Sequence, residues 1–151
     1  MPPNCNWILG STPVKRGHFK WCVDAAGALH LRSGAGQLHV TADELVRLRD
    51  YLLERPRRLG NNMDGRPATV PPGDAIGWDF IVESLGRNGC HMWASHLIGV
   101  LLQADLVSLQ EESGGYRAYQ AIAGRCWQTA LTGYAARPAV SPQAGRPVAT
   151  P

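Results

Sequence analysis

The chain has 151 residues, of which 44% are hydrophobic and 18% are charged, a composition that excludes disorder of the whole chain. No segment approaches the roughly 20 apolar residues of a membrane-spanning helix, which excludes a helical membrane protein. The net charge is +3, but the charges are unevenly distributed. Residues 1–60 hold nine Lys or Arg against five Asp or Glu, and residues 61–135 hold four Lys or Arg against seven Asp or Glu. Any anion-binding surface is therefore expected in the first half or in the tail.

Residues 18–40 alternate between apolar and polar side chains, which is the pattern of strands with one buried face. Turn-forming residues interrupt the alternation at residues 24–27 and 33–36. The pattern predicts a three-stranded antiparallel meander, and residues 7–9 are a candidate fourth strand. The apolar face consists of Phe19, Trp21, Val23, Leu29, Leu31, Leu38 and Val40.

A helix is predicted from Thr41 to Glu54. Thr41 and Glu44 have the spacing of a capping box, in which each side chain accepts a hydrogen bond from the backbone of the other residue. Leucines then recur at helical spacing, and Pro56 ends the helix. Its apolar stripe is expected to cover the meander, so that residues 1–55 form one lobe.

Residues 56–74 are rich in Pro and Gly and show no periodicity, which predicts a long loop between this lobe and a second one. Asp74 is expected to cap a helix over residues 76–85. A second helix is expected from about residue 91 to residue 104, where apolar residues recur at helical spacing.

Strands are predicted over residues 106–109 and 116–122, which pair across two glycines, and a short helix over residues 126–131. These elements make up a second lobe over residues 75–134. Residues 135–151 contain Pro, Ala and Gly without apolar periodicity and are predicted to be a disordered tail. The predicted fold class is therefore α+β.

The second lobe resembles winged helix-turn-helix transcription factors over residues 75–122. In that family a helix ending in Leu-Gly precedes the recognition helix, and an Ala-Gly-Leu-Val corner opens the wing; here Asp105 takes the place of that glycine. The resemblance implies DNA binding through residues 91–95, with the helix at residues 41–54 as a candidate third helix. The matching segments are Leu85-Gly86, His96-Leu97, Ala104-Asp105-Leu106-Val107, Gly114-Gly115 and Tyr119.

Arginines are the predicted nucleic-acid contacts, since binding to phosphate requires cations. Five of them cluster within twelve residues at the end of the first helix, where the helix dipole also favours cations. The segment between Asn88 and Tyr116 contains no Lys or Arg, which is unusual for a DNA-reading helix. The predicted contact residues are Arg47, Arg49, Arg55, Arg57, Arg58, Arg87 and Arg117.

The polar face of the meander is a second candidate surface for nucleic acid. Its cations and histidines could track a phosphate backbone while an exposed aromatic ring stacks on bases, and the outline is similar to single-stranded-DNA-binding coactivators that place a meander before a long helix. The structural alternative is an ordinary solvated outer face, with Phe19 and Trp21 in the core. The residues on the polar face are His18, Lys20, His30, Arg32 and His39.

No metal site, cofactor or catalytic residue is predicted. His18 with Cys22, or Cys90 with His91 and His96, are potential ligands, but the sequence has no pair of ligand clusters at the spacing of a zinc site. Asp79 and Glu83 share a helix face, but no nucleophile or base partner accompanies them.

Widely spaced cysteines without a C-x-x-C pair, and an N-terminus without a basic residue before its short apolar run, predict a cytoplasmic protein with reduced thiols. Five tryptophans are many for this length, and Trp93 with His96 is the predicted partner-binding site. We therefore expect a non-enzymatic regulatory protein that acts through DNA or a DNA-bound partner. The alternatives are an interaction adaptor or inhibitor with a winged-helix-like fold that does not bind nucleic acid, which includes self-association as a homo-oligomer, and a small enzyme.

Overall fold

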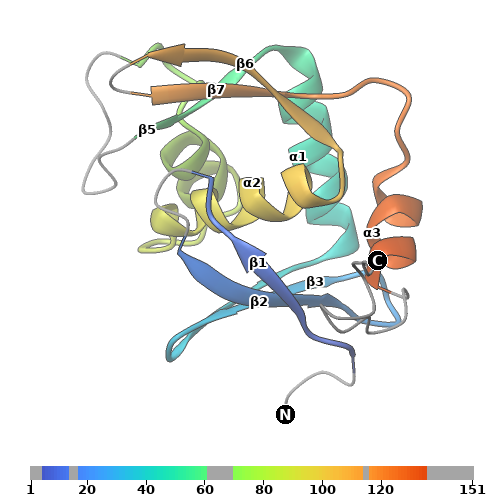
Figure 1. The fold of residues 1–151 in the computed structure, drawn as a ribbon. Coiled ribbons are helices and arrows are strands. Elements are labelled where there is room, and N and C mark those ends of the chain that lie inside the picture. The colour runs from blue at the N-terminus through green and yellow to red at the C-terminus, as the bar shows by residue number, and fades with distance from the viewer. Residues whose placement is uncertain (1–4, 14–16, 61–69, 114–115, 136–151) are drawn as a thin grey trace, which may run out of the picture.

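A computed structural model describes residues 5–13, 17–60, 70–113 and 116–135. It is a mixed α+β fold with an N-terminal antiparallel sheet, as predicted (Figure 1). None of its helices is long and apolar enough to span a bilayer. The elements are β1 (Ile8–Ser11), β2 (His18–Val23), β3 (Leu29–Ser33), β4 (Gly36–Val40), α1 (Ala42–Glu54), β5 (Arg57–Gly60), η1 (Ile76–Ser84), η2 (His91–Trp93), α2 (Ala94–Gln103), β6 (Val107–Ser113), β7 (Tyr116–Ala121) and α3 (Trp127–Ala135).

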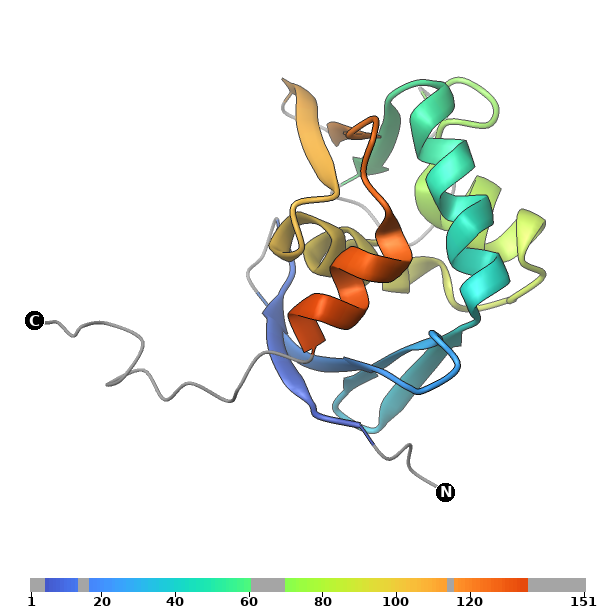
Figure 2. The ribbon, with the colours of Figure 1, turned by 90° about the vertical axis from the view of Figure 1, so that its right-hand side faces the viewer.

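The first sheet has the order β1-β2-β3-β4, and all its strand pairs are antiparallel. The candidate fourth strand at the N-terminus is therefore present as β1. The apolar face predicted from the alternation is buried, and Trp21 and Leu29 are fully inaccessible. The helices α1, α2 and α3 all lie on this apolar side, so the other face of the sheet carries no helix (Figures 1 and 2).

The second sheet has the order β5-β7-β6 and includes the predicted hairpin. Its edge strand β5 lies inside the segment predicted to be a loop, so that prediction is wrong for residues 57–60. Four residues are too few to show a periodic pattern, and their pairing with β7 is a long-range contact that local sequence does not reveal. Residues 61–69 of the predicted loop, like the predicted disordered tail from residue 136 onward, lie outside the described residues.

The helix predicted from about residue 91 is divided into the short 3-10 helix η2 and helix α2, which begins at Ala94. Thr41 and Glu44 form the predicted capping box at the start of α1. The role of Asp74 is a second correction. Asp74 does not cap η1; its carboxylate pairs with Arg57, and the Ala75 N–H donates instead to the Asp79 carboxylate at 2.9 Å. Residues 76–84 of η1 form a π-helix, which is rare over more than one turn.

One continuous core joins the two predicted lobes. The apolar face of the first sheet and the buried sides of α1, η1 and α2 belong to the same cluster of buried residues. The rings of Tyr51 on α1 and Phe80 on η1 pack 5.0 Å apart between centroids. Helix α1 is thus in contact with the helices of the second lobe as well as with its own sheet.

The cysteines differ from the expectation of reduced thiols. Cys5 and Cys22 form a disulfide, which ties the segment before β1 to the outer side of β2. Cys90 and Cys126 are free, and only Cys126 of these two is exposed. The prediction of reduced thiols is therefore wrong for the first pair, because spacing along the chain does not show which cysteines the folded sheet brings together.

Candidate functional site

Helix α2, to which the winged-helix resemblance assigns DNA contact, is covered by the first sheet. Residues 97–101 of this helix are buried, and a Cβ at Gly99 would collide with the carbonyl oxygen of Ser11 on β1. The Gln103 side chain accepts a hydrogen bond from Trp21 Nε1 at 3.0 Å and donates one to the Leu9 carbonyl at 3.1 Å. A recognition helix needs an exposed face to enter the major groove. Partly exposed side chains of α2 are confined to its two ends, at residues 95–96 near the predicted contact residues 91–95 and at residues 102–103.

The seven arginines predicted to bind nucleic acid are spread over α1, β5, the segment after η1 and β7, and they have intramolecular partners. Arg47 donates to Ser84, Arg49 pairs with Asp50, Arg55 and Arg57 pair with Glu54 and Asp74, Arg87 pairs with Glu44, and Arg117 pairs with Glu112. Arg58 places its guanidinium carbon 4.2 Å from the centroid of the Tyr116 ring. Because an existing ion pair must be broken or shared before a phosphate is bound, these arginines are less available than their number suggests.

Arg57 is the least accessible of these arginines, with 3% of its surface exposed. Its Nη1 lies 3.1 Å from Asp74 Oδ1, and its Nε donates to the Tyr51 carbonyl at 2.9 Å. Its guanidinium carbon also lies 4.0 Å from the Tyr51 ring centroid. These contacts hold the end of α1 against the start of η1, so Arg57 has a structural role and does not reach a ligand at the surface.

The predicted partner-binding residues Trp93 and His96 lie side by side, with ring centroids 4.7 Å apart. Phe19 packs edge-on against His96 from the first sheet, at 5.0 Å. Burial lowers the pKa of His96. Trp93 is partly buried against the core and contacts the β3–β4 turn at Gly36, whereas its neighbour Met92 is 55% exposed.

The uncovered face of the first sheet brings together the residues of the second candidate surface. Lys20, Arg32 and Gln37 are directly opposite one another on β2, β3 and β4, and therefore point to the same side. Arg32 reaches across β2, and its guanidinium carbon lies 4.5 Å from the centroid of the Trp7 ring. This open face therefore combines two cations with an aromatic ring.

Carboxylate pairing distinguishes this open face from five of the seven predicted arginines. Within the described part of the chain, Lys20 and Arg32 have no carboxylate within ion-pair distance. Among the described residues, Arg47 and Arg58 likewise have no carboxylate within ion-pair distance. Lys20 is exposed and Arg32 is partly exposed. The charges of Lys20 and Arg32 are therefore free to act on an anion at this face.

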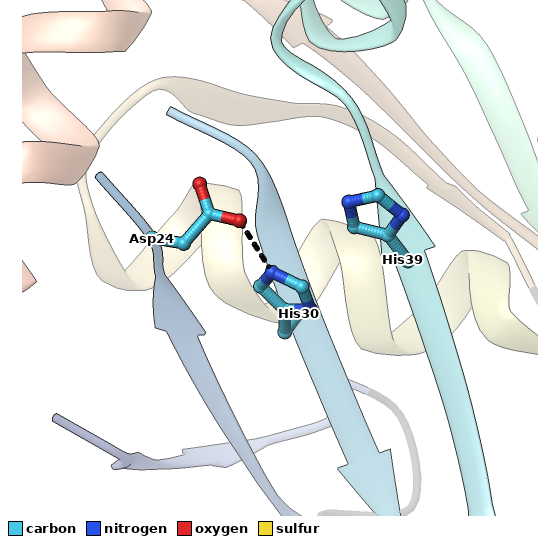
Figure 3. A group of neighbouring side chains, drawn as sticks. All are labelled: Asp24, His30 and His39. Carbon is cyan, nitrogen blue, oxygen red and sulfur yellow. Dashed lines mark hydrogen bonds and ion pairs between the residues drawn. The ribbon is translucent and has the colours of Figure 1, made fainter. Parts of the chain in front are cut away.

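The next row of the same face carries His30 and His39, which are directly opposite each other on β3 and β4 (Figure 3). Their rings are stacked with centroids 4.6 Å apart. His30 Nε2 lies 2.8 Å from Asp24 Oδ2, and this hydrogen bond is the main reason that the pKa of Asp24 is lowered. The other oxygen of Asp24 accepts from the backbone N–H groups of Ala26 and Ala28, at 2.9 and 3.0 Å. This is the group of side chains that could hold a metal ion.

A hollow of about 460 Å³ adjoins the open face along β1 and reaches α2. Leu9, Gly10 and Ser11 form one wall, and Gly99 and Gln103 form the opposite wall. Among the described residues that line it, His18 is the one titratable side chain, so these residues do not provide the paired acid and base that hydrolytic chemistry uses.

Two residues of the open face were not identified from sequence. Trp7 lies just before β1, and only the pairing of β1 with β2 places its ring within reach of Arg32. Asp24 was predicted to be a turn residue. Its position two residues after Cys22 gave no indication of the contact with His30. The turn sequence Asp-Ala-Ala-Gly was the available signal, since an aspartate that begins a hairpin turn is held close to the first residues of the next strand.

Comparisons with protein-family models, with curated proteins and with solved structures return no match to this chain.

Proposed function

We propose that this protein binds single-stranded nucleic acid on the open face of its first sheet. The observation that carries the proposal is the contact of Arg32 with the Trp7 ring, with Lys20 directly opposite Arg32 on the neighbouring strand. Among the described residues neither cation has a carboxylate partner, and α1, α2 and α3 all lie on the other side of the sheet (Figures 1 and 2). The non-enzymatic regulatory role expected from the sequence then uses this sheet, rather than helix α2, as its contact surface.

Lys20 and Arg32 supply the phosphate contacts in this proposal. They occupy adjacent strands, and neighbouring strands lie about 4.8 Å apart, so both side chains can reach one stretch of backbone. The planar guanidinium of Arg32 lies over Trp7, and a base that stacks on this layer gains about 1–3 kcal/mol without regard to its identity. Binding is therefore expected to depend on salt and to show little sequence preference.

The width of the sheet favours a single strand over a duplex. Four strands span about 14 Å between the outer backbones, whereas the major groove of DNA is about 12 Å wide and admits a helix or a two-stranded ribbon. An extended single strand can lie across such a surface and expose its bases to Trp7.

The test is fluorescence anisotropy with a labelled single-stranded oligonucleotide of about 15 nucleotides and with the matching duplex. The variant Lys20→Ala/Arg32→Ala should weaken single-strand binding about tenfold or more. The matched control is Arg49→Ala/Arg125→Ala, which removes the same charge from a partly exposed and an exposed arginine that already pair with Asp50 and Asp105. Equal weakening by both double variants would mean that only net charge matters, and tighter binding of the duplex would contradict the choice of a single strand.

A second candidate function, a protein-interaction adaptor, is favoured by one observation on the same face. Leu9 is directly opposite Lys20 and is 62% exposed, so it adds an apolar side chain to the cationic face. If the face binds protein, the wild type should bind no oligonucleotide in the anisotropy assay, and Leu9→Ser should change self-association in sedimentation velocity experiments.

A further inference from the structure

We propose that Asp24, His30 and His39 form a binding site for one zinc ion at the edge of the open face. The site comes from the β2–β3 turn, β3 and β4, and it does not depend on whether the face binds nucleic acid (Figure 3). No zinc motif is visible along the chain, because the three ligands are spread over sixteen residues and come together only through strand pairing.

The spacing of the side chains is close to what zinc requires. One ligand atom from each residue lies within 4.8 Å of those of the other two. Zinc binds nitrogen and oxygen ligands at about 2.0–2.2 Å, so two ligand atoms of a tetrahedral site lie about 3.4 Å apart and the ligand atoms must move together by about 1 Å. His39 is exposed and has no side-chain hydrogen bond among the described residues. Its ring can therefore rotate away from the stack on His30 and bring its ligand nitrogen closer to the ligand atoms of Asp24 and His30.

The other two ligands are already oriented. Two backbone N–H groups fix Oδ1 of Asp24 and leave Oδ2 directed at His30 Nε2, 2.8 Å away. The ion would take the place of the hydrogen atom between these two atoms. Hydrogen bonds to a ligating carboxylate are the usual means by which a protein orients a metal ligand, and Ala26 and Ala28 supply them here.

The ligand chemistry selects the metal and leaves one coordination position open. Two imidazoles and one carboxylate suit a borderline ion such as zinc better than calcium or magnesium, which prefer oxygen ligands. Three protein ligands leave the fourth tetrahedral position to water. Asp24 also lines a hollow of about 550 Å³ between the β2–β3 turn and α3, so solvent reaches this end of the site.

The test is a zinc titration of the chelator-treated full-length protein by isothermal calorimetry, in the absence of nucleic acid. Wild type should bind one zinc ion, and cobalt should give the visible absorption of a four-coordinate site. His39→Ala should weaken binding by at least about 10–100-fold, the loss seen even when only an outer hydrogen bond to a ligand is removed. His18→Ala is the matched control, because His18 is an exposed histidine on the same sheet outside the site, and its affinity should stay within about twofold of wild type.

His39→Ala removes an exposed side chain and should leave the melting temperature unchanged, which keeps the result independent of folding. Asp24→Asn should weaken zinc binding as well, provided that its melting curve shows a folded protein. The absence of one-to-one binding in the wild type, or equal affinity of His39→Ala and His18→Ala, would overturn the proposal. Oligonucleotide binding by the zinc-free protein is measured separately, so either proposal can fail alone.

Discussion

The indole Nε1 of Trp21 donates a hydrogen bond to Oε1 of Gln103 at 3.0 Å, and this contact joins the centre of the first sheet to the last residue of α2. The amide nitrogen of the same glutamine donates to the Leu9 carbonyl on β1 and to the Tyr134 hydroxyl on α3. One side chain therefore connects the sheet, α2 and α3. This connection holds the sheet over α2 and turns the opposite sheet face toward solvent.

Replacement of Gln103 by alanine should destabilise the protein by about 1–3 kcal/mol, because the fully buried Trp21 would keep an indole N–H without a partner. Gln120→Ala is the control, since Gln120 donates an exposed hydrogen bond to the Leu53 carbonyl and should change stability by less than about 0.5 kcal/mol. Urea denaturation measures both free energies of unfolding. Equal effects of the two substitutions would show that Gln103 does not hold the sheet in place.

Acid should destabilise the β2–β3 turn through Asp24. Its pKa is lowered in the folded protein, mainly by the hydrogen bond from His30, so the folded state binds the proton of Asp24 less readily than the unfolded state does. This contribution to stability is complete above the unfolded value of about 3.9 and is lost as the pH falls through the lower folded pKa. Urea denaturation at pH 7 and pH 3 should therefore show a smaller acid-induced loss in Asp24→Asn than in wild type. A loss of the same size in both proteins would exclude this role.

Trp93 should contribute to stability more than to partner binding. Its ring packs against His96 and lies close to Gly36, where an added Cβ would be 3.2 Å from Trp93 Cζ2. We expect Trp93→Ala to lower the free energy of unfolding by about 2 kcal/mol or more, less than the 3–5 kcal/mol of a fully buried indole. Met92→Ala, which removes an exposed neighbour, should have little effect. If Trp93→Ala instead leaves the melting temperature unchanged and abolishes self-association, Trp93 is an interface anchor, as the sequence analysis proposed.

Local patterns predicted the elements well, and long-range contacts account for what was missed. Alternation identified the strands of the first sheet, and the capping box at Thr41 placed the start of α1. Strand β5 was not predicted, because this four-residue strand is defined by its pairing with β7. Asp74 was predicted to be a helix cap, whereas Arg57 binds its carboxylate in the folded protein.

The candidate site was only partly predictable for the same reason. Composition showed where arginines are frequent, but not that carboxylates pair with five of the seven predicted contact arginines, since ion pairs such as Arg87–Glu44 join residues far apart in sequence. The polar residues of the open face followed from alternation, whereas the contact between Trp7 and Arg32 depends on the register of three strands. Charge pairing thus shifts the favoured surface from the arginines of α1 to Lys20 and Arg32.

The salt dependence of single-strand binding separates these two surfaces. Each phosphate contact on a single strand contributes about 0.7 to the slope of log K against log salt. Lys20→Ala/Arg32→Ala should therefore reduce the magnitude of the slope by about 1.4, whereas Arg55→Ala/Arg58→Ala should leave it unchanged. The opposite result, in which the slope falls only when Arg55 and Arg58 are replaced, would place nucleic acid on the arginines at the end of α1 and contradict binding on the open sheet face.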